Sequence, residues 1–214
     1  NAVGNSLEIP FRTIGESFRH FIEHHPNKIA IVSVDQGFSL DFKRLNDLVE
    51  RSARAMLELG VKPGDRVAIL SGECVEKLVL MFATWRCGAS ACPFHTEIHS
   101  DHLKDILKTI NPALVVWRQD MDGLALTEGL NCSTSAFSQL NESKGFFSFS
   151  GNLLPFPSCE REYGPGDEGC IFATSGTTDR PKCVVWDHLG LWMCGLSTIN
   201  FTAMNTDDRI LEYR

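Results

Sequence analysis

The sequence predicts an α/β fold built around a parallel sheet. Short apolar segments of strand length alternate with longer segments in which apolar residues recur about every three or four positions, the spacing of one face of a helix. The alternation runs from residue 13 to residue 117 and resumes at Cys170. Strands that alternate with helices in this way usually lie parallel in one sheet, with the helices packed on its faces.

The first predicted element is an amphipathic helix that begins after Thr13. Thr13 and Glu16 have the spacing of a capping box, in which each side chain accepts a hydrogen bond from the other residue's backbone N–H. Pro26 is expected to lie beyond the helix end, because proline disrupts a helix interior. A strand at 29–34 and a turn at 35–37 follow. The apolar face of the helix consists of Ile14, Phe18, Phe21 and Ile22.

A second, longer helix is predicted to end at Gly60, because glycine readily adopts the left-handed backbone common after helices. Its inward face contains Leu45, Leu48, Val49, Ser52, Ala53, Met56 and Leu57. Three strands, at 66–70, 89–93 and 113–117, then alternate with two helices. The first of these helices ends at Gly88 and turns inward Val75, Leu78, Val79, Phe82 and Trp85. The second is capped by Ser100 and carries Leu103, Ile106, Leu107 and Ile110.

Residues 118–166 lack this alternation. They are rich in Gly, Ser, Asn and Pro, so we predict irregular surface structure for them. From Cys170 the pattern resumes with a strand, a polar loop, a strand at 184–186, a helix at 191–197 and a strand at 210–213. We therefore predict a first α/β subdomain at 1–166, with an irregular excursion at 118–166, and the start of a second, incomplete α/β subdomain at 167–214.

The composition is that of a globular protein with an ordinary core, 43% hydrophobic and 22% charged. The net charge of −7 and the lack of any lysine or arginine run argue against nucleic acid or an anionic membrane as a partner. The longest apolar segments are of strand length, so no membrane span is predicted. The eight cysteines are dispersed without a Cys-x-x-Cys pair, a pattern that predicts buried free thiols in a reducing cytoplasm.

The most informative segment is the polar loop between two apolar runs at 171–185. It offers the hydroxyls and the backbone N–H groups that suit phosphate oxygens, with an ammonium group at its edge. A Walker loop is excluded, because Pro181 and Cys183 flank the lysine where that motif has Gly and Ser/Thr. The candidate phosphate-binding residues are Thr174, Ser175, Gly176, Thr177, Thr178 and Lys182.

This loop resembles the signature of the adenylate-forming superfamily, Thr-Ser-Gly-Thr/Ser-Thr-Gly-x-Pro-Lys-Gly. That group includes acyl- and aryl-CoA synthetases, nonribosomal peptide synthetase adenylation domains and luciferases. Asp179 and Cys183 replace two of its glycines. The segments 38–42, 60–69, 85–93 and 165–167 are also similar to family segments, in family order, so the resemblance covers roughly residues 10–214.

The resemblance implies an enzyme that joins a small carboxylic acid to ATP, with Mg²⁺, and passes the acyl group to a thiol. The thiol acceptor is CoA or phosphopantetheine; the segment that begins at Trp85 is closer to that of CoA ligases. Lys182 is the implied catalytic residue, and Thr174, Ser175, Gly176, Thr177 and Thr178 are the implied nucleotide-binding residues. Two alternatives remain: a peptide synthetase adenylation domain, and a degenerate, non-catalytic module marked by Asp179 and Cys183.

By the same resemblance, the chain corresponds to about the first two-fifths of such an enzyme. The family's adenine- and ribose-binding residues and its small C-terminal domain lie further along. We therefore expect the C-terminal part of the same enzyme, or a partner chain, to complete the site, and we expect residues 1–214 alone to be inactive.

The histidines and tryptophans are given structural roles with one exception. His188 is either part of the acid-substrate pocket, by the resemblance, or a packing residue. His24 and His25 are predicted at the end of the first helix, where positive charge suits the helix dipole. No metal ligand is predicted: solvated or helix-capping roles are favoured for His95, His99 and His102, although their spacing would allow a metal site. The residues predicted in the core are Trp85, Trp117, Trp186 and Trp192.

Overall fold

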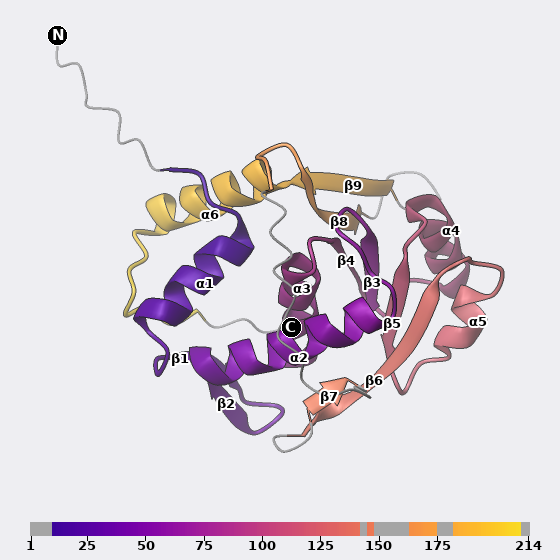
Figure 1. The fold of residues 1–214 in the computed structure, drawn as a ribbon, viewed down its shortest axis with the longest axis horizontal. Coiled ribbons are helices and arrows are strands. Elements are labelled where there is room, and N and C mark those ends of the chain that lie inside the picture. The colour runs from indigo at the N-terminus through magenta and orange to yellow at the C-terminus, as the bar shows by residue number, and fades with distance from the viewer. Residues whose placement is uncertain (1–9, 142–144, 148–162, 175–181, 211–214) are drawn as a thin grey trace, which may run out of the picture.

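The computed structural model describes residues 10–141, 145–147, 163–174 and 182–210. It is a layered α/β structure in which helices cover a twisted sheet (Figure 1). In chain order its elements are α1 (Ile14–His24), β1 (Ile29–Ser33), β2 (Phe38–Asp41), α2 (Phe42–Glu58), β3 (Arg66–Leu70), α3 (Val75–Arg86), β4 (Ser90–Phe94), α4 (Ser100–Ile110), β5 (Leu114–Arg118), α5 (Gly123–Thr127), β6 (Ser133–Asn141), β7 (Gly145–Phe147), β8 (Glu168–Thr174), β9 (Lys182–Asp187) and α6 (His188–Thr202).

The central sheet has seven strands in the order β7-β6-β5-β3-β4-β8-β9. The pairs β6–β5, β5–β3, β3–β4 and β4–β8 are parallel, and the edge strands β7 and β9 pair antiparallel. Strands β1 and β2 form a separate antiparallel hairpin. The predicted α/β class with a parallel sheet is therefore confirmed.

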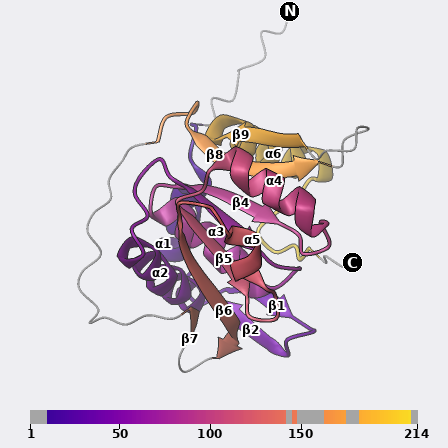
Figure 2. The ribbon, with the colours of Figure 1, turned by 90° about the vertical axis from the view of Figure 1, so that its right-hand side faces the viewer.

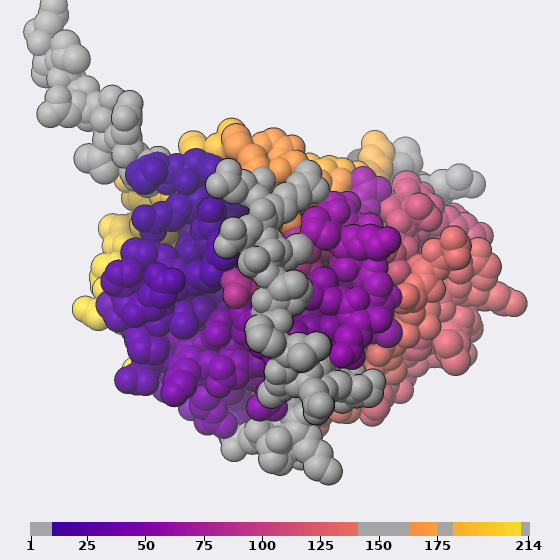
Figure 3. All heavy atoms as spheres, in the orientation of Figure 1, coloured from indigo at the N-terminus to yellow at the C-terminus, as the bar shows by residue number. Residues whose placement is uncertain are grey.

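Both faces of the sheet are covered by helices. Along β3, Val67 and Ile69 pack toward α2 and α3, whereas Ala68 and Leu70 pack toward α4, because successive side chains of a strand point to opposite faces. Figure 2 shows α4 and α5 on the opposite side of the sheet from α2 and α3. In the space-filling view of Figure 3, α1 and α2 form much of the visible surface. A strand buried on both faces is apolar throughout, as β3 is after its first residue.

The predicted helix signals are present in the structure. The Thr13 N–H donates to Glu16 Oε2 at 2.6 Å, and the Glu16 N–H donates to Thr13 Oγ1 at 3.1 Å, which completes the capping box. Gly60 and Gly88 follow α2 and α3 with φ of 93° and 77°, a backbone region that favours glycine. His99, rather than the predicted Ser100, is the N-cap of α4.

The segment 118–166 is not irregular throughout, which corrects one prediction. Residues 133–141 form β6, which pairs parallel with β5, and α5 precedes it. The sequence of β6 is mostly polar, and within 133–140 Phe137 is the residue that is buried, so its composition resembled that of a loop. The subdomain boundary at 166 stays a prediction; β8 and β9, which follow it, extend the same sheet.

Other differences concern the last elements and the orientation of single side chains. Ile210 belongs to no helix or strand, and the rest of the strand predicted at 210–213 lies outside the described residues. Leu78 and Trp186 were predicted inward but are partly exposed, and Cys194 is an exposed thiol. Helix α6 is rich in apolar residues, yet His188 is its buried residue. Its exposed large apolar side chains are Leu189, Met193, Ile199 and Phe201.

Candidate functional site

The two ends of the predicted phosphate loop are joined by a strand ladder. Thr174, the last residue of β8, is the antiparallel partner of Lys182, the first residue of β9. The Thr174 hydroxyl donates a hydrogen bond to the Lys182 carbonyl oxygen at 3.4 Å, and both residues are exposed. Directly opposed residues have their side chains on the same face of a sheet. The ladder therefore places Thr174 and Lys182 next to each other where the loop begins and ends, with their side chains on the same face of the sheet.

The rest of the loop is not placed by the structure. Ser175, Gly176, Thr177 and Thr178 lie outside the described residues, and so does Asp179. Their assignment to phosphate binding stays a prediction, as does that of Thr174 and Lys182.

An ion pair fixes the start of β8 to the sheet. Arg66 donates from Nε to Glu168 Oε1 and from Nη2 to Glu168 Oε2, both at 2.8 Å, and from Nη1 to the Ile110 carbonyl oxygen at 2.9 Å. Burial alone would raise the pKa of Glu168, but the hydrogen bonds and the charge of Arg66 outweigh it, so the pKa is lowered. We call this arrangement the Arg66–Glu168 brace; it joins β8 to β3 and to the end of α4.

A second attachment of β8 comes from α3. The buried indole N–H of Trp85 donates to the Gly169 carbonyl oxygen at 2.7 Å. A Cβ on Gly169 would lie 2.8 Å from Leu191 Cδ1 and 3.2 Å from His188 Nδ1, so a side chain at this position would require these two side chains of α6 to shift. The Trp85 hydrogen bond and the brace therefore hold β8 in addition to the short ladder between β4 and β8, in which Ala91 and Cys170 are the paired residues.

His188 is a buried residue at the start of α6. Its side chain is 2% exposed, its ring centroid lies 5.0 Å from that of Tyr163, and burial lowers its pKa. Among the described residues, neither ring nitrogen has a hydrogen-bond partner. Of the two roles left open by the sequence, the packing role has these contacts in its support; a role toward an acid substrate stays a prediction.

The loop ends lie at the carboxyl edge of the parallel strands. Because β4 and β8 run parallel with Ala91 opposite Cys170, His95 and Thr174 are each four positions further toward this edge. A Cβ on Gly72, which follows β3, would lie 3.9 Å from His95 Nε2 and 4.0 Å from Thr96 Oγ1. Ligands in α/β sheets bind at this edge, so Gly72 and Thr96 are candidates that sequence reasoning missed. Their one signal was a position two residues after the end of a strand.

Comparison with known protein families shows which family this chain belongs to. The sequence model of the family described as AMP-binding enzyme matches residues 18–213. The chain belongs to the AMP-binding enzyme family. This membership agrees with the resemblance seen in the sequence.

The AMP-binding relatives include proteins of two kinds. Gramicidin S synthase 2 of Brevibacillus brevis is 26% identical over 201 residues, which are 94% of this chain and 4% of that protein. The long-chain-fatty-acid–CoA ligase FadD13 of Mycobacterium tuberculosis is 25% identical over 202 residues, 94% of this chain and 40% of that protein. The chain thus spans less than half the length of these relatives.

A solved structure has the same fold. The ATP-bound MatB of Rhodopseudomonas palustris matches with a TM-score of 0.73 and 24% identity, over 91% of this chain and 39% of that one. In the described part of this chain, no helix combines the length and the apolar character needed to cross a bilayer.

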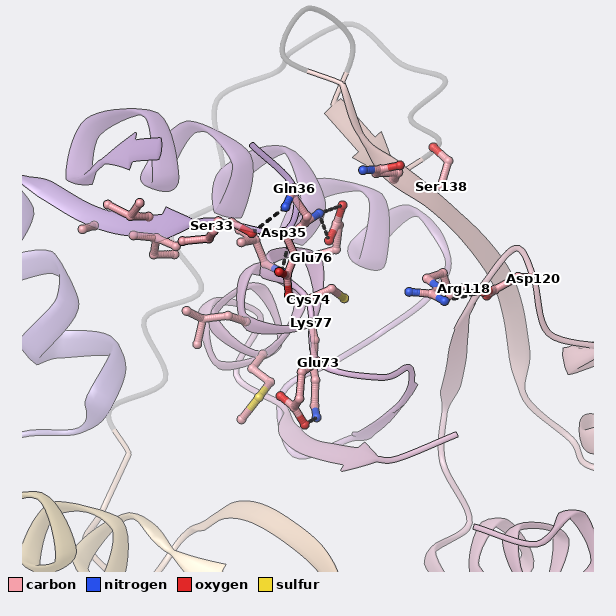
Figure 4. A pocket seen from close by; sticks show the side chains of 18 of the residues that line it. Ser33, Asp35, Gln36, Glu73, Cys74, Glu76, Lys77, Arg118, Asp120 and Ser138 are labelled. Carbon is pink, nitrogen blue, oxygen red and sulfur yellow. Dashed lines mark hydrogen bonds and ion pairs between the residues drawn. The ribbon is translucent and has the colours of Figure 1, made fainter. Parts of the chain in front are cut away.

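A large groove lies elsewhere on the AMP-binding domain. It has a volume of about 1110 Å³ and is lined by residues of β1, the start of α3 and the ends of β5 and β6 (Figure 4). Within it, the buried carboxylate of Glu76 accepts two hydrogen bonds from Gln36 Nε2 at 3.0 Å and one from the Leu140 N–H at 2.5 Å. Glu76 thereby joins α3, the β1–β2 turn and β6. Neither Thr174 nor Lys182 lines this groove.

Proposed function

We propose that the chain is the N-terminal part of an ATP-dependent enzyme that activates a carboxylic acid as an acyl-adenylate and then transfers the acyl group to a thiol. The observation that carries the proposal is the β8–β9 hairpin, in which Thr174 and Lys182 flank the phosphate-loop sequence, within a domain of the AMP-binding enzyme family.

The proposed chemistry requires stabilisation of a leaving group. The carboxylate of the substrate attacks the α-phosphorus of ATP, the bond to the bridging oxygen breaks, and pyrophosphate leaves. The loop hydroxyls and N–H groups would hold the β- and γ-phosphate oxygens while Lys182 offsets the developing negative charge. Hydroxyls and an ammonium group are hydrogen-bond donors, which suit phosphate oxygens. A Mg²⁺ ion would be bound mainly through phosphate oxygens and water, and it would therefore enter with the nucleotide.

For the acceptor we favour CoA, with a carrier-protein phosphopantetheine as the alternative. The segment that starts at Trp85 is closer to that of CoA ligases. The relatives give no preference, since a peptide synthetase and a CoA ligase match at 26% and 25% identity. Acyl transfer from the adenylate to free CoA, measured against transfer to a carrier protein, separates the two.

The test of the proposal is carboxylate-dependent exchange of labelled pyrophosphate into ATP by the complete enzyme. Lys182→Ala should lower kcat/KM for ATP roughly 10- to 150-fold, because a hydrogen bond to a charged group contributes about 1.5 to 3 kcal/mol. Lys108→Ala is the matched control: Lys108 is an exposed lysine in the last turn of α4, toward the opposite edge of the sheet. Equal exchange rates for the wild type and Lys182→Ala would refute the role of Lys182.

The competing candidate is a degenerate module that binds without catalysis, motivated by Asp179 and Cys183 in place of two family glycines. A complete enzyme that binds ATP but catalyses no exchange with any carboxylic acid would favour it. Residues 1–214 alone should show no exchange under either reading, because the adenine, ribose and acid contacts are expected further along the chain; robust exchange by this chain alone would overturn that expectation.

A further inference from the structure

Two histidines and a glutamate converge on the exposed face of α1. His20, Glu23 and His24 are spaced at i, i+3 and i+4, which places them on one side of the helix across a single turn. One potential ligand atom from each lies within 4.8 Å of the others, and all three residues are exposed. We propose that this cluster binds one divalent transition-metal ion of the Zn²⁺ or Ni²⁺ type.

The orientation of His24 suits a metal ligand. Its Nδ1 lies 2.7 Å from the His20 carbonyl oxygen. Because a carbonyl oxygen only accepts, Nδ1 must carry the proton, which leaves the lone pair of Nε2 available. Metal-binding histidines usually donate their other ring N–H to a carbonyl or carboxylate in this way, and that hydrogen bond holds the ring in position.

The ligand types select the class of ion. Two imidazoles with one carboxylate suit Zn²⁺, Ni²⁺ and Cu²⁺, whereas Mg²⁺ and Ca²⁺ prefer oxygen ligands. The helix end adds to the attraction, because His24 is the last residue of α1 and the free carbonyl groups there carry partial negative charge. Waters would complete the coordination, since three side chains leave at least one position open.

The site lies on a helix that is fixed to the domain. On the opposite side of α1, Phe18 is buried and stacks on Phe82 of α3 with ring centroids 4.3 Å apart. Figure 3 shows α1 at the molecular surface. An ion bound there would bridge consecutive turns of α1 without displacing the contacts that hold the helix in place.

The experiment is calorimetric titration of the chain with NiCl₂ and ZnCl₂ in a buffer that does not bind metal. We expect one ion per chain, and His20→Ala and His24→Ala should each weaken binding at least about tenfold. Glu23→Gln should weaken it less than the alanine variants do, because the amide still offers an oxygen ligand, although a poorer one than a carboxylate. The matched controls are His99→Ala and His102→Ala, which remove the exposed N-cap histidine and a half-buried histidine of the first turn of α4 and should leave the affinity unchanged.

The outcomes separate the proposal from non-specific metal binding. Unchanged affinity in His20→Ala and His24→Ala, or equal loss in the α4 controls, would overturn it. One ion per two chains would also overturn it, since that ratio indicates a bridge between molecules. MgCl₂ should give no comparable heat; binding of Mg²⁺ with the same affinity would contradict the assigned class of ion. Far-ultraviolet circular dichroism of each variant checks that the fold is retained.

Discussion

Substitution of Glu168 by glutamine tests whether the Arg66–Glu168 brace holds β8 in the sheet. The change removes the negative charge but keeps the shape of the side chain. The side chains are 36% and 26% exposed, so the pair is neither fully buried nor freely solvated. Exposed pairs contribute about 0 to 1 kcal/mol and well-covered hydrogen bonds to charged groups about 1.5 to 3 kcal/mol. We expect Glu168→Gln to lower the free energy of unfolding by about 1 to 2 kcal/mol at pH 7.

The same pair predicts a pH dependence with a defined sign. The pKa of Glu168 in the folded chain is lowered below its ordinary value of 4.5. A lowered folded-state pKa contributes stability above the unfolded-state pKa, and that contribution is lost as the pH falls through the folded-state pKa. The difference in unfolding free energy between the wild type and Glu168→Gln should therefore be largest at neutral pH and disappear well below pH 4.5.

Urea unfolding followed by tryptophan fluorescence measures this difference. Asp120→Asn is the matched control, because Arg118 also pairs with Asp120, from Nε to both carboxylate oxygens at 2.8 and 3.0 Å and from Nη2 to Oδ2, but these side chains are 44% and 57% exposed. The control should lose less than about 1 kcal/mol. A loss in Glu168→Gln no larger than in the control, or one that does not change with pH, would refute the structural role of the brace.

Three further predictions follow from other residues. Trp85→Phe removes the donor to the Gly169 carbonyl oxygen and should lower the free energy of unfolding in urea by about 1 to 3 kcal/mol; an unchanged midpoint would contradict it. Asp179→Gly removes a carboxylate from the predicted phosphate loop and should tighten ATP binding to the complete enzyme up to about tenfold; equal or weaker affinity by calorimetry would mean that the carboxylate faces away or supports the turn. Phe201→Ser removes a side chain that is 92% exposed on α6 and should reduce self-association of the chain in sedimentation velocity, because exposed apolar surface favours association; unchanged sedimentation would exclude this part of α6 as the contact.

The elements up to residue 117 were predictable because local signals agreed with one another. The capping box at Thr13, the apolar face of α2 and the glycines after α2 and α3 each act over a few residues. Strand β6 was missed because it is polar apart from Ala136, Phe137 and Leu140, and strand prediction depends on apolar alternation. Its pairing with β5 supplies backbone hydrogen bonds that composition does not reveal.

The candidate site was predictable only in its local part. A strand, a polar loop and a second strand were predicted from the sequence, and the structure pairs the two strands, with Thr174 opposite Lys182. The brace had no such signal, because Arg66 and Glu168 are separated by 102 positions. The approach of Gly72 to Thr96 likewise depends on the order of strands in the sheet, which the sequence did not specify.

The place of β8 beside β4 has a consequence for the order of folding. During synthesis, β3, β4, β5 and β6 precede β8, and the residues paired between β4 and β8 are about 80 positions apart, a long loop to close. Strands β3, β4, β5 and β6 can therefore assemble while the backbone of β4 is still an open edge. At that stage the β8–β9 hairpin does not yet cover Ala91 and Cys92. Open edges of this kind recruit other strands. We expect the nascent chain to be most prone to aggregation in the interval between completion of β6 and arrival of β8.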